Sequence, residues 1–259
     1  MCYDKSYLTK KLEKYGKRYA RTPKEEAFII EQIEKLNIPP AYYASGFSHP
    51  LAPVITDEHP DQVQAYSWGM IPSWSKDTMT AVKLSNQCLN ARGETIFEKP
   101  AFRSSAKSKR CLIICVDGFF EHFHKDKHTY PHFIRMRNDE PMTFAGLWDR
   151  WENREEGVVR YTYTIVTTRA NALLDKLHNN PKREGGDSRM PVILPKELEQ
   201  DWLKPINDKV DKELIQSLIQ PYPAELMEAW PVRQVKGKKG VGNSELAVQP
   251  FEYPELAGY

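Results

Sequence analysis

The stretch Cys111-Leu-Ile-Ile-Cys-Val-Asp-Gly-Phe-Phe-Glu-His122 decides the fold. Its first six residues carry no charge, and this apolar run predicts a strand that is covered on both faces. Gly118 predicts a bulge or a close approach of another part of the chain. Glu121 follows two phenylalanines, so we expect lost hydration to raise its pKa toward neutrality, as acid–base catalysis requires. The alternative is that Glu121 begins a solvated hairpin arm.

Short apolar segments separated by turn residues surround this strand. Extended segments are predicted at 51–56, 63–68, 130–136, 142–148, 161–167, 189–194 and 230–235. Apolar residues at helical spacing predict a first helix between Leu8 and Tyr19, and a second helix begins at Thr22. A further helix is expected at 171–177. Hairpins with peripheral helices favour an α+β fold, which we expect to be a single domain over 1–259 with an antiparallel, barrel-like sheet.

Composition excludes several classes of protein. The 259 residues are 40% hydrophobic and 28% charged, and no apolar run approaches the length of a membrane span. The first residues lack the apolar stretch of a secretory signal, and four cysteines do not suggest a disulfide framework. We therefore expect a cytoplasmic protein with no membrane partner. A net charge of +2 is too small to indicate nucleic-acid binding by itself.

Local features leave several alternatives open. The basic face of the first helix is either solvated or able to approach phosphates. Trp74, next to Ser75 and Lys76, either packs as a plug or stacks on a base. Cys111 and Cys115 precede four histidines, but their spacing within a buried strand suits zinc poorly. We expect core cysteines there, and neither a metal ion nor another cofactor.

Cys2 is the most informative cysteine. Removal of Met1, which normally occurs before a small residue, would leave a free 1,2-aminothiol. An α-amino group has a pKa of roughly 7.7 to 8.0, so much of it is a neutral nucleophile at physiological pH. It can attack an aldehyde to give a Schiff base, and the thiol can then close a thiazolidine ring. The alternative is an ordinary second residue in a frayed terminus.

Several short motifs occur in one order along nearly the whole chain. They are Cys2, Trp68-Gly-Met-Ile-Pro72, Leu89-Asn-Ala-Arg-Gly-Glu-Thr95, Asp117-Gly-Phe-Phe-Glu121, His178, Arg189-Met-Pro191 and Val241-Gly-Asn243. This ordered set resembles the SRAP family, the SOS response-associated peptidases or abasic-site processing proteins. The resemblance implies a DNA-repair factor that crosslinks its N-terminal cysteine to an abasic site in single-stranded DNA.

The resemblance also implies roles for individual residues. Cys2 is the expected nucleophile, Asn90 a positioning group, Glu121 the acid and base for opening the sugar ring, and His178 a further proton-transfer group. Phosphates need fixed cations and unpaired bases need a stacking surface, so we expect DNA contacts elsewhere on the chain. The expected DNA-binding residues are Arg92, Trp74, Arg189, Lys236, Lys238, Lys239 and Asn243. We expect a bacterial-type monomer that is nucleoid-associated when bound to DNA.

The sequence departs from the family pattern at three places. Tyr3-Asp4 replaces the usual Gly-Arg after the cysteine, which removes a phosphate contact and adds an acid. A Tyr-Asn-x-x-Pro motif is replaced around 43–46. A longer polar loop, 179–188, separates His178 from Arg189 and could displace the histidine.

Two other functions are compatible with these residues. A cysteine peptidase or autoprotease would pair Cys2 with His178. A noncovalent single-stranded nucleic-acid-binding module would use the basic segments and Trp74.

Overall fold

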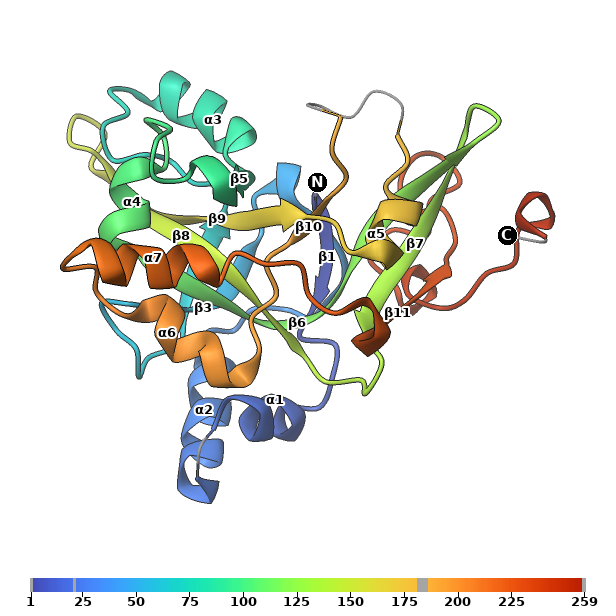
Figure 1. The fold of residues 1–259 in the computed structure, drawn as a ribbon, viewed down its shortest axis with the longest axis horizontal. Helices are drawn as coiled ribbons and strands as arrows, with labels where there is room; N and C mark the ends of the chain where they lie inside the picture. Colours follow the sequence, from blue (N-terminus) through green and yellow to red (C-terminus); the bar gives the residue numbers. More distant parts are fainter. Residues whose placement is uncertain (1, 21, 181–185, 258–259) are drawn as a thin grey trace.

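The computed structural model describes residues 2–20, 22–180 and 186–257 (Figure 1). The strands are β1 (Asp4–Tyr7), β2 (Ala41–Ser45), β3 (Leu51–Thr56), β4 (Gln64–Trp68), β5 (Asn90–Arg92), β6 (Arg110–Lys125), β7 (His128–Met136), β8 (Met142–Asn153), β9 (Val158–Arg169), β10 (Arg189–Pro191) and β11 (Met227–Pro231). The α-helices are α1 (Leu12–Tyr19), α2 (Pro23–Lys35), α3 (Thr78–Gln87), α4 (Arg103–Ser108), α5 (Ala172–Leu177), α6 (Glu199–Leu203) and α7 (Lys209–Ser217). Part of the predicted loop 179–188, residues 181–185, lies outside the described residues.

Strand pairing closes a barrel. β6 pairs with β3 and β8, β3 with β4, β4 with β9, and β9 with β8, so these five strands form a ring. A closed ring leaves none of its strands with an unpaired edge. The predicted α+β fold with a barrel-like core is confirmed. One pairing in the ring, between β4 and β9, is parallel, which the sequence did not indicate because no hairpin joins these strands.

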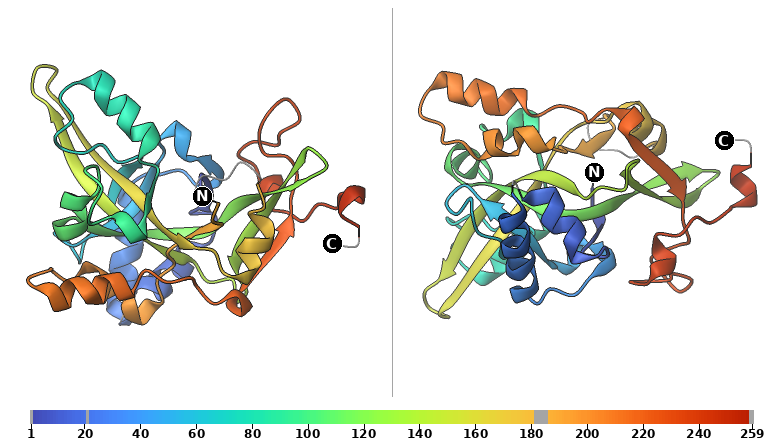
Figure 2. Two further views of the ribbon diagram at one scale, coloured as in Figure 1. Left: turned by 45° about the horizontal axis from the view of Figure 1, so that its top comes forward. Right: turned by 90° about the horizontal axis from the view of Figure 1, so that it is seen from below.

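β6 belongs to two parts of the fold. Residues 110–116 pair with β8 in the barrel, whereas residues 119–125 pair with β7 in an arm that β11 extends. This arm lies apart from α3, α4 and α7 in both Figure 1 and Figure 2. β11 begins and ends earlier than the predicted segment 230–235. Its pairing with β7 runs from Met227, opposite Met136, to Pro231, opposite His132.

The central strand is covered on both faces, as its apolar run predicted. Cys111 and Ile113 pack in the cluster that contains Cys2, whereas Leu112 and Ile114 pack in a second cluster on the opposite face. All four β6 residues are at most 1% exposed. The alternation follows from the two-residue period of a strand.

The bulge and the close approach in β6 occur at different residues. The register between β6 and β8 shifts between Ile113 and Val116, and Cys115 adopts φ 59°, which places the bulge there. At Gly118, a β-carbon would lie 2.2 Å from the ring of Phe133. Gly118 therefore allows β6 and β7 to pack closely just before the residues that reach the site.

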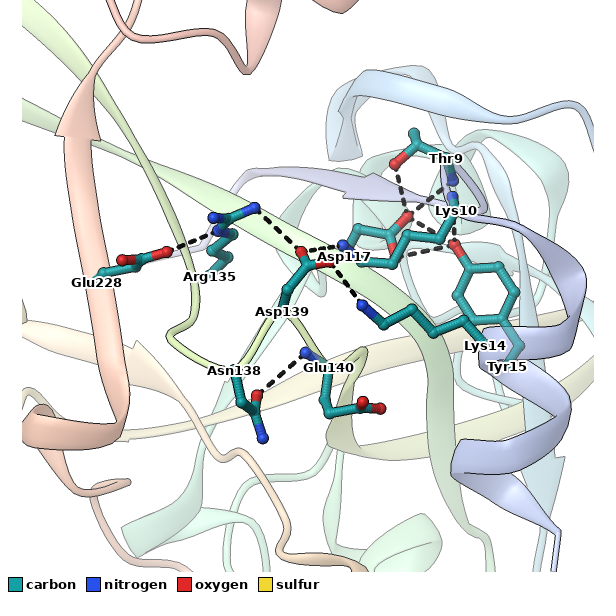
Figure 3. Close-up of polar contacts among 10 residues, drawn as sticks. All are labelled: Thr9, Lys10, Lys14, Tyr15, Asp117, Arg135, Asn138, Asp139, Glu140 and Glu228. Carbon is teal, nitrogen blue, oxygen red and sulfur yellow. Dashed lines mark hydrogen bonds and ion pairs between the residues drawn. The ribbon is translucent and has the colours of Figure 1, made fainter.

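A buried carboxylate anchors the chain that follows β1. Asp117 accepts hydrogen bonds from the backbone N–H of Thr9 at 2.7 Å, from its hydroxyl at 2.9 Å and from the Tyr15 hydroxyl at 2.8 Å (Figure 3). β1 itself pairs with β2 and β6. The first strand is thus held on both edges and at its end, which fixes the position of Cys2.

The second predicted helix is confirmed at its start. The Thr22 hydroxyl accepts a hydrogen bond from the Glu25 N–H at 3.3 Å, and Pro23 occupies the first turn of α2. Within the described ranges, no helix is both long enough and apolar enough to cross a membrane.

The close packing at Gly118 gives a test of the fold. Gly118→Ala should destabilise the protein by about 3 kcal/mol, because the methyl group has no space beside Phe133. Gly157→Ala is the control: nothing lies within 4 Å of its β-carbon, and only its left-handed backbone, φ 65°, costs about 1 kcal/mol. Urea unfolding of both variants measures the difference, and equal losses would contradict the packing argument.

Candidate active site

Cys2 lies in the buried core and not in a frayed terminus. Its side chain is 1% exposed, and its thiol donates a hydrogen bond to the Asp4 carbonyl, with sulfur and oxygen 3.8 Å apart. Burial raises the pKa of the Cys2 thiol to about 12, and the nearby Glu121 carboxylate acts in the same direction. The thiol is therefore protonated at neutral pH and needs a base before it can act as a nucleophile.

Asn90 and Cys2 are brought together by the tertiary structure. The Asn90 side-chain amide donates a hydrogen bond to the Cys2 carbonyl at 2.8 Å. The short strand β5 presents Asn90 there by pairing in parallel with β9. The other polar atom of this side chain, Oδ1, is buried and has no hydrogen-bond partner within the described residues. It can accept a hydrogen bond from a bound group beside Cys2.

Glu121 and His178 form a buried pair. Glu121 Oε2 and His178 Nδ1 are 3.0 Å apart, and each residue is 7% exposed. His178 follows α5, where its N–H closes the last turn by donating to the Leu174 carbonyl. A second hydrogen bond reaches Glu121 Oε1 from the backbone N–H of His122 at 3.0 Å.

The expected pKa of Glu121 was wrong in direction. Burial alone raises the pKa of this carboxyl, but the hydrogen bonds from His178 and the His122 N–H bring it below its usual range. Hydrogen bonds to the ionised form favour that form. Glu121 is therefore a carboxylate at neutral pH, ready to accept a proton, and the adjacent imidazole is placed to exchange one.

A small pocket opens beside this pair. It has a volume of about 220 Å³ and is lined by Tyr3, Asp4, Phe120, Glu121, His122, His124, Thr129, His178 and Asn180. The Asp4 carboxylate within it accepts hydrogen bonds from the Tyr43 hydroxyl at 2.8 Å and from Lys236 Nζ at 3.0 Å. The extra acid at position 4 is therefore neutralised by a lysine near the other end of the chain.

A larger groove lies on the other side of Tyr3. Its volume is about 660 Å³, and its lining includes Tyr3, Phe47, Trp74, Asn90 and Arg92. Tyr3 stacks on Phe47 with ring centroids 5.4 Å apart, and Trp74 is 52% exposed. Trp74 and Arg92 were predicted from the sequence as DNA-binding residues. The Tyr3–Phe47 stack was not predicted, because these two rings are distant in the sequence and come together only in the folded chain.

Other residues that we expected to bind DNA have partners in the fold. Arg189 donates to the two Glu94 carboxylate oxygens at 2.7 and 2.8 Å and to the Thr167 carbonyl at 2.8 Å, and its side chain is 3% exposed. Asn243 Oδ1 accepts hydrogen bonds from the N–H groups of Tyr42 and Tyr43 at 2.8 and 3.2 Å. We interpret both residues as supports of the site.

The lysines of the C-terminal loop divide into two kinds. Lys236 forms the ion pair with Asp4, although its side chain is still 50% exposed. Lys238 and Lys239 are exposed residues of the same loop. Their predicted contact with DNA stays a prediction.

Three of the basic residues at and before α1 are paired within the protein. Lys10 and Lys14 form ion pairs with Asp139, which Arg135 also contacts (Figure 3). Arg18 pairs with Glu199. These pairs join the start of the chain to the β7–β8 turn and to α6, so we interpret these three residues as structural. Lys11 and Lys17 are exposed, and their approach to phosphates stays a prediction.

The longer loop does not displace His178. Ser188 donates a hydrogen bond from its hydroxyl to the His178 carbonyl at 3.2 Å. Asn179 exchanges two hydrogen bonds with the backbone of His124, at 2.7 and 2.8 Å. Both described ends of the loop are therefore fixed against the site.

The chain is similar to several known proteins. A model of the family described as SOS response associated peptidase (SRAP) matches residues 3–238. Abasic site processing protein YoqW of Bacillus subtilis is 38% identical over 224 residues, 83% of this chain and 92% of that protein. Abasic site processing protein HMCES of Xenopus tropicalis is 28% identical over 158 residues, 54% of this chain and 44% of that protein. A solved structure from Bacteroides thetaiotaomicron has a TM-score of 0.80 and 32% identity, and covers 97% of this chain and 100% of that one.

The Glu121–His178 pair gives a test by titration. In His178→Ala, the pKa of Glu121 should rise, because burial remains while the hydrogen bond and the charge of His178 are lost. In the wild type, the depressed pKa of Glu121 stabilises the folded state at pH values above the unfolded-state pKa. This stabilisation is lost as the pH falls through the folded-state pKa. This pH-dependent stabilisation should be smaller in the variant, because the pKa of Glu121 is less depressed in its folded state.

Carbon-13 NMR of the Glu121 carboxyl group, followed against pH, measures the shift. His128→Ala, at an exposed residue of β7, is the control. A Glu121 pKa that stays depressed in His178→Ala would show that the imidazole is not its main partner.

Proposed function

Because this chain belongs to the SOS response associated peptidase (SRAP) family, we propose that it processes abasic sites in DNA and captures them covalently through Cys2. The relatives described as abasic site processing proteins support the first part of the proposal. The observation that carries the second part is the position of Cys2 itself. It is held by Asn90 and lies near the buried Glu121–His178 pair.

The α-amino group of Cys2 is the first nucleophile in this mechanism. Removal of Met1, which lies outside the described residues, would expose the α-amino group of Cys2. A free α-amino group has a pKa of roughly 7.7 to 8.0 and is partly neutral at physiological pH. Its nitrogen attacks the sugar aldehyde, and loss of water gives an imine. The buried Oδ1 of Asn90 is available to orient this amine.

Opening of the sugar ring precedes the attack of the amine. An abasic deoxyribose is mostly a closed hemiacetal, so its aldehyde must first be released. The Glu121 carboxylate accepts the proton of the anomeric hydroxyl, and the His178 imidazole donates a proton to the ring oxygen as the C–O bond breaks. The same pair then serves the departure of water during imine formation. Burial keeps the two groups in one geometry.

Closure of the thiazolidine ring makes the adduct durable. The Cys2 sulfur adds to the imine carbon, and the nitrogen accepts the electron pair of the C=N bond. The product is a five-membered thiazolidine that resists simple imine hydrolysis. A serine at position 2 would close the corresponding ring far more slowly, because an alkoxide is much harder to generate at neutral pH than a thiolate.

The groove supports single-stranded DNA as the substrate. Unpaired bases can stack on Trp74 and on the Tyr3–Phe47 pair, and such stacking needs bases that are not engaged in a duplex. Arg92 lies in the same groove, where its cation can contact a phosphate. Asn90 joins the groove to the nucleophile, since it lines one and bonds to the other.

Cys2→Ser tests the covalent mechanism. The variant should still form an imine with an oligonucleotide that contains an abasic site, because its α-amino group remains. It should lose the heat-stable adduct that the wild type forms, because its hydroxyl cannot replace the thiol. Denaturing gels run with and without borohydride separate the two products.

The same experiment separates three functions. A heat-stable adduct of Cys2→Ser at the wild-type rate would overturn the thiazolidine mechanism. Peptide cleavage without any adduct in processed wild-type protein would favour a cysteine peptidase. Affinity for single strands without any adduct would favour noncovalent binding.

Arg92→Ala tests the groove. Binding to single-stranded DNA should weaken by about tenfold, and the slope of log affinity against log salt should fall by about 0.7, the value for one phosphate contact. Fluorescence anisotropy at several salt concentrations measures both quantities. Lys209→Ala on α7 is the matched control, since this exposed lysine lies outside the groove. Unchanged affinity and slope in Arg92→Ala would remove Arg92 as a phosphate contact.

A further inference from the structure

The first strand places a lysine inside the protein. Lys5 pairs with Ala44 of β2 and Phe119 of β6, and its side chain is 0% exposed. Its Nζ atom has no hydrogen-bond partner within the described residues. A buried amine without a partner costs free energy that an apolar side chain at this position would not. This cost indicates that the Lys5 amine has a role other than core packing.

Aromatic rings surround the amine. Nζ lies 4.8 Å from the ring centroid of Tyr7, 5.4 Å from that of Trp68 and 5.3 Å from that of Tyr163. Their π faces attract a cation, but this attraction is weaker than the cost of fully burying an ammonium. Burial accordingly lowers the pKa of Lys5 to about 7. The side chain can thus be neutral at physiological pH and still hold a proton when it receives one.

The other ionisable groups around Lys5 are thiols and phenols. Trp68 and Tyr163, whose rings face the amine, lie in the same buried cluster as Cys2 and Cys111. Among the nearby thiols, Cys2 has the largest electrostatic effect on the pKa of Lys5. Cys111 and Cys115 are enclosed within β6, whereas Cys2 sits where Asn90 joins the groove. Tyr163 interacts with Cys2 as well, and burial raises the pKa of this phenol well above its usual range. Neither it nor Tyr7 competes with an amine as a base.

We propose that Lys5 is the general base that takes the thiol proton of Cys2 as the thiazolidine ring closes. This inference rests on the proposed covalent capture of abasic sites and deepens it, because that mechanism leaves the acceptor of the thiol proton unassigned. In that mechanism Glu121 and His178 serve the opening of the sugar and the departure of water, and the Asp4 carboxylate is paired with Lys236 and Tyr43. Lys5 is the buried basic group near Cys2 that has no such engagement.

The proposed step balances in atoms and charge. The S–H bond of Cys2 breaks while an N–H bond forms on Lys5, and the sulfur forms its bond to the carbon of the protonated imine. The electron pair of the C=N bond returns to the nitrogen, which becomes a neutral ring amine. One positive charge is present before and after the step. It moves from the imine to the Lys5 ammonium, which the three aromatic rings stabilise.

The two pKa values are compatible with this role. A thiol with a pKa of about 12 does not give its proton to Lys5 in the resting protein. The imine cation beside the sulfur favours the thiolate, and a general base takes the proton in the transition state as the C–S bond forms. A thiolate and a Lys5 ammonium therefore do not have to form in the core before the imine is present.

Lys5→Met tests the proposal by separating imine formation from ring closure. Methionine keeps the length of the side chain and removes the base. The adduct trapped by borohydride should form at the wild-type rate, whereas the heat-stable adduct should form about 10²- to 10⁴-fold more slowly. Lys209→Met, at a side chain that is 86% exposed, is the matched control and should behave as the wild type. Equal rates of heat-stable adduct in Lys5→Met and the wild type would overturn the proposal.

A second measurement needs no DNA. Formaldehyde closes a thiazolidine on an N-terminal cysteine, and intact-protein mass spectrometry follows the product. Ring closure should be slowed in Lys5→Met by a similar factor. If the wild type closes this ring in a Lys5-dependent way but does not capture abasic DNA, the proposed substrate fails and the role of Lys5 stands. If ring closure with formaldehyde is independent of Lys5, the role of Lys5 is overturned.

Folding of the variant is checked by circular dichroism and thermal unfolding. Lys5→Leu provides a second apolar replacement with a different shape. Removing the buried amine should raise the melting temperature of at least one of the two variants, because the burial cost is lost. Failure of both to fold would show that Lys5 is required by the core, and would overturn the argument from burial.

Discussion

The structure depends on one strand that serves two sheets. β6 is 16 residues long, and its first half closes the barrel while its second half forms the arm with β7. The bulge at Cys115 and the absence of a side chain at Gly118 allow this change of partners. Glu121 lies just beyond the change, where the strand leaves the barrel but is still buried. The catalytic carboxylate of the proposed mechanism is therefore placed by barrel closure.

Order at the start of the chain is the second requirement. A residue so close to a terminus is usually mobile, which would make a precise nucleophile impossible. Here β1 is inserted between β2 and β6, and Asp117 holds the turn that follows. Cys2 therefore belongs to the same core as the barrel strands. The same insertion carries Lys5 into the interior, so one strand supplies both the proposed nucleophile and the proposed base.

Charges near the site are mostly matched within the fold. His178 faces Glu121, Lys236 faces Asp4, and Arg189 faces Glu94. Such pairing limits the cost of burying each charge and fixes the side chains. Among the buried polar atoms without a hydrogen-bond partner in the described residues, Lys5 Nζ and Asn90 Oδ1 belong to residues that interact with Cys2. Groups that the fold leaves unpaired beside a nucleophile are available to a substrate or to a proton.

The sequence by itself determined the features that local patterns encode. The apolar run of β6, the Thr22 cap of α2 and the order of the motifs were enough for the fold class and the family. Only the tertiary structure decided which groups face one another. It reversed the expected direction of the Glu121 pKa shift by placing His178 beside this carboxyl group, and it paired Arg189 with Glu94. It also joined β4 and β9 in parallel and buried Lys5. The physical reason is that hydration and hydrogen bonding depend on partners distant in the chain, which no local pattern specifies.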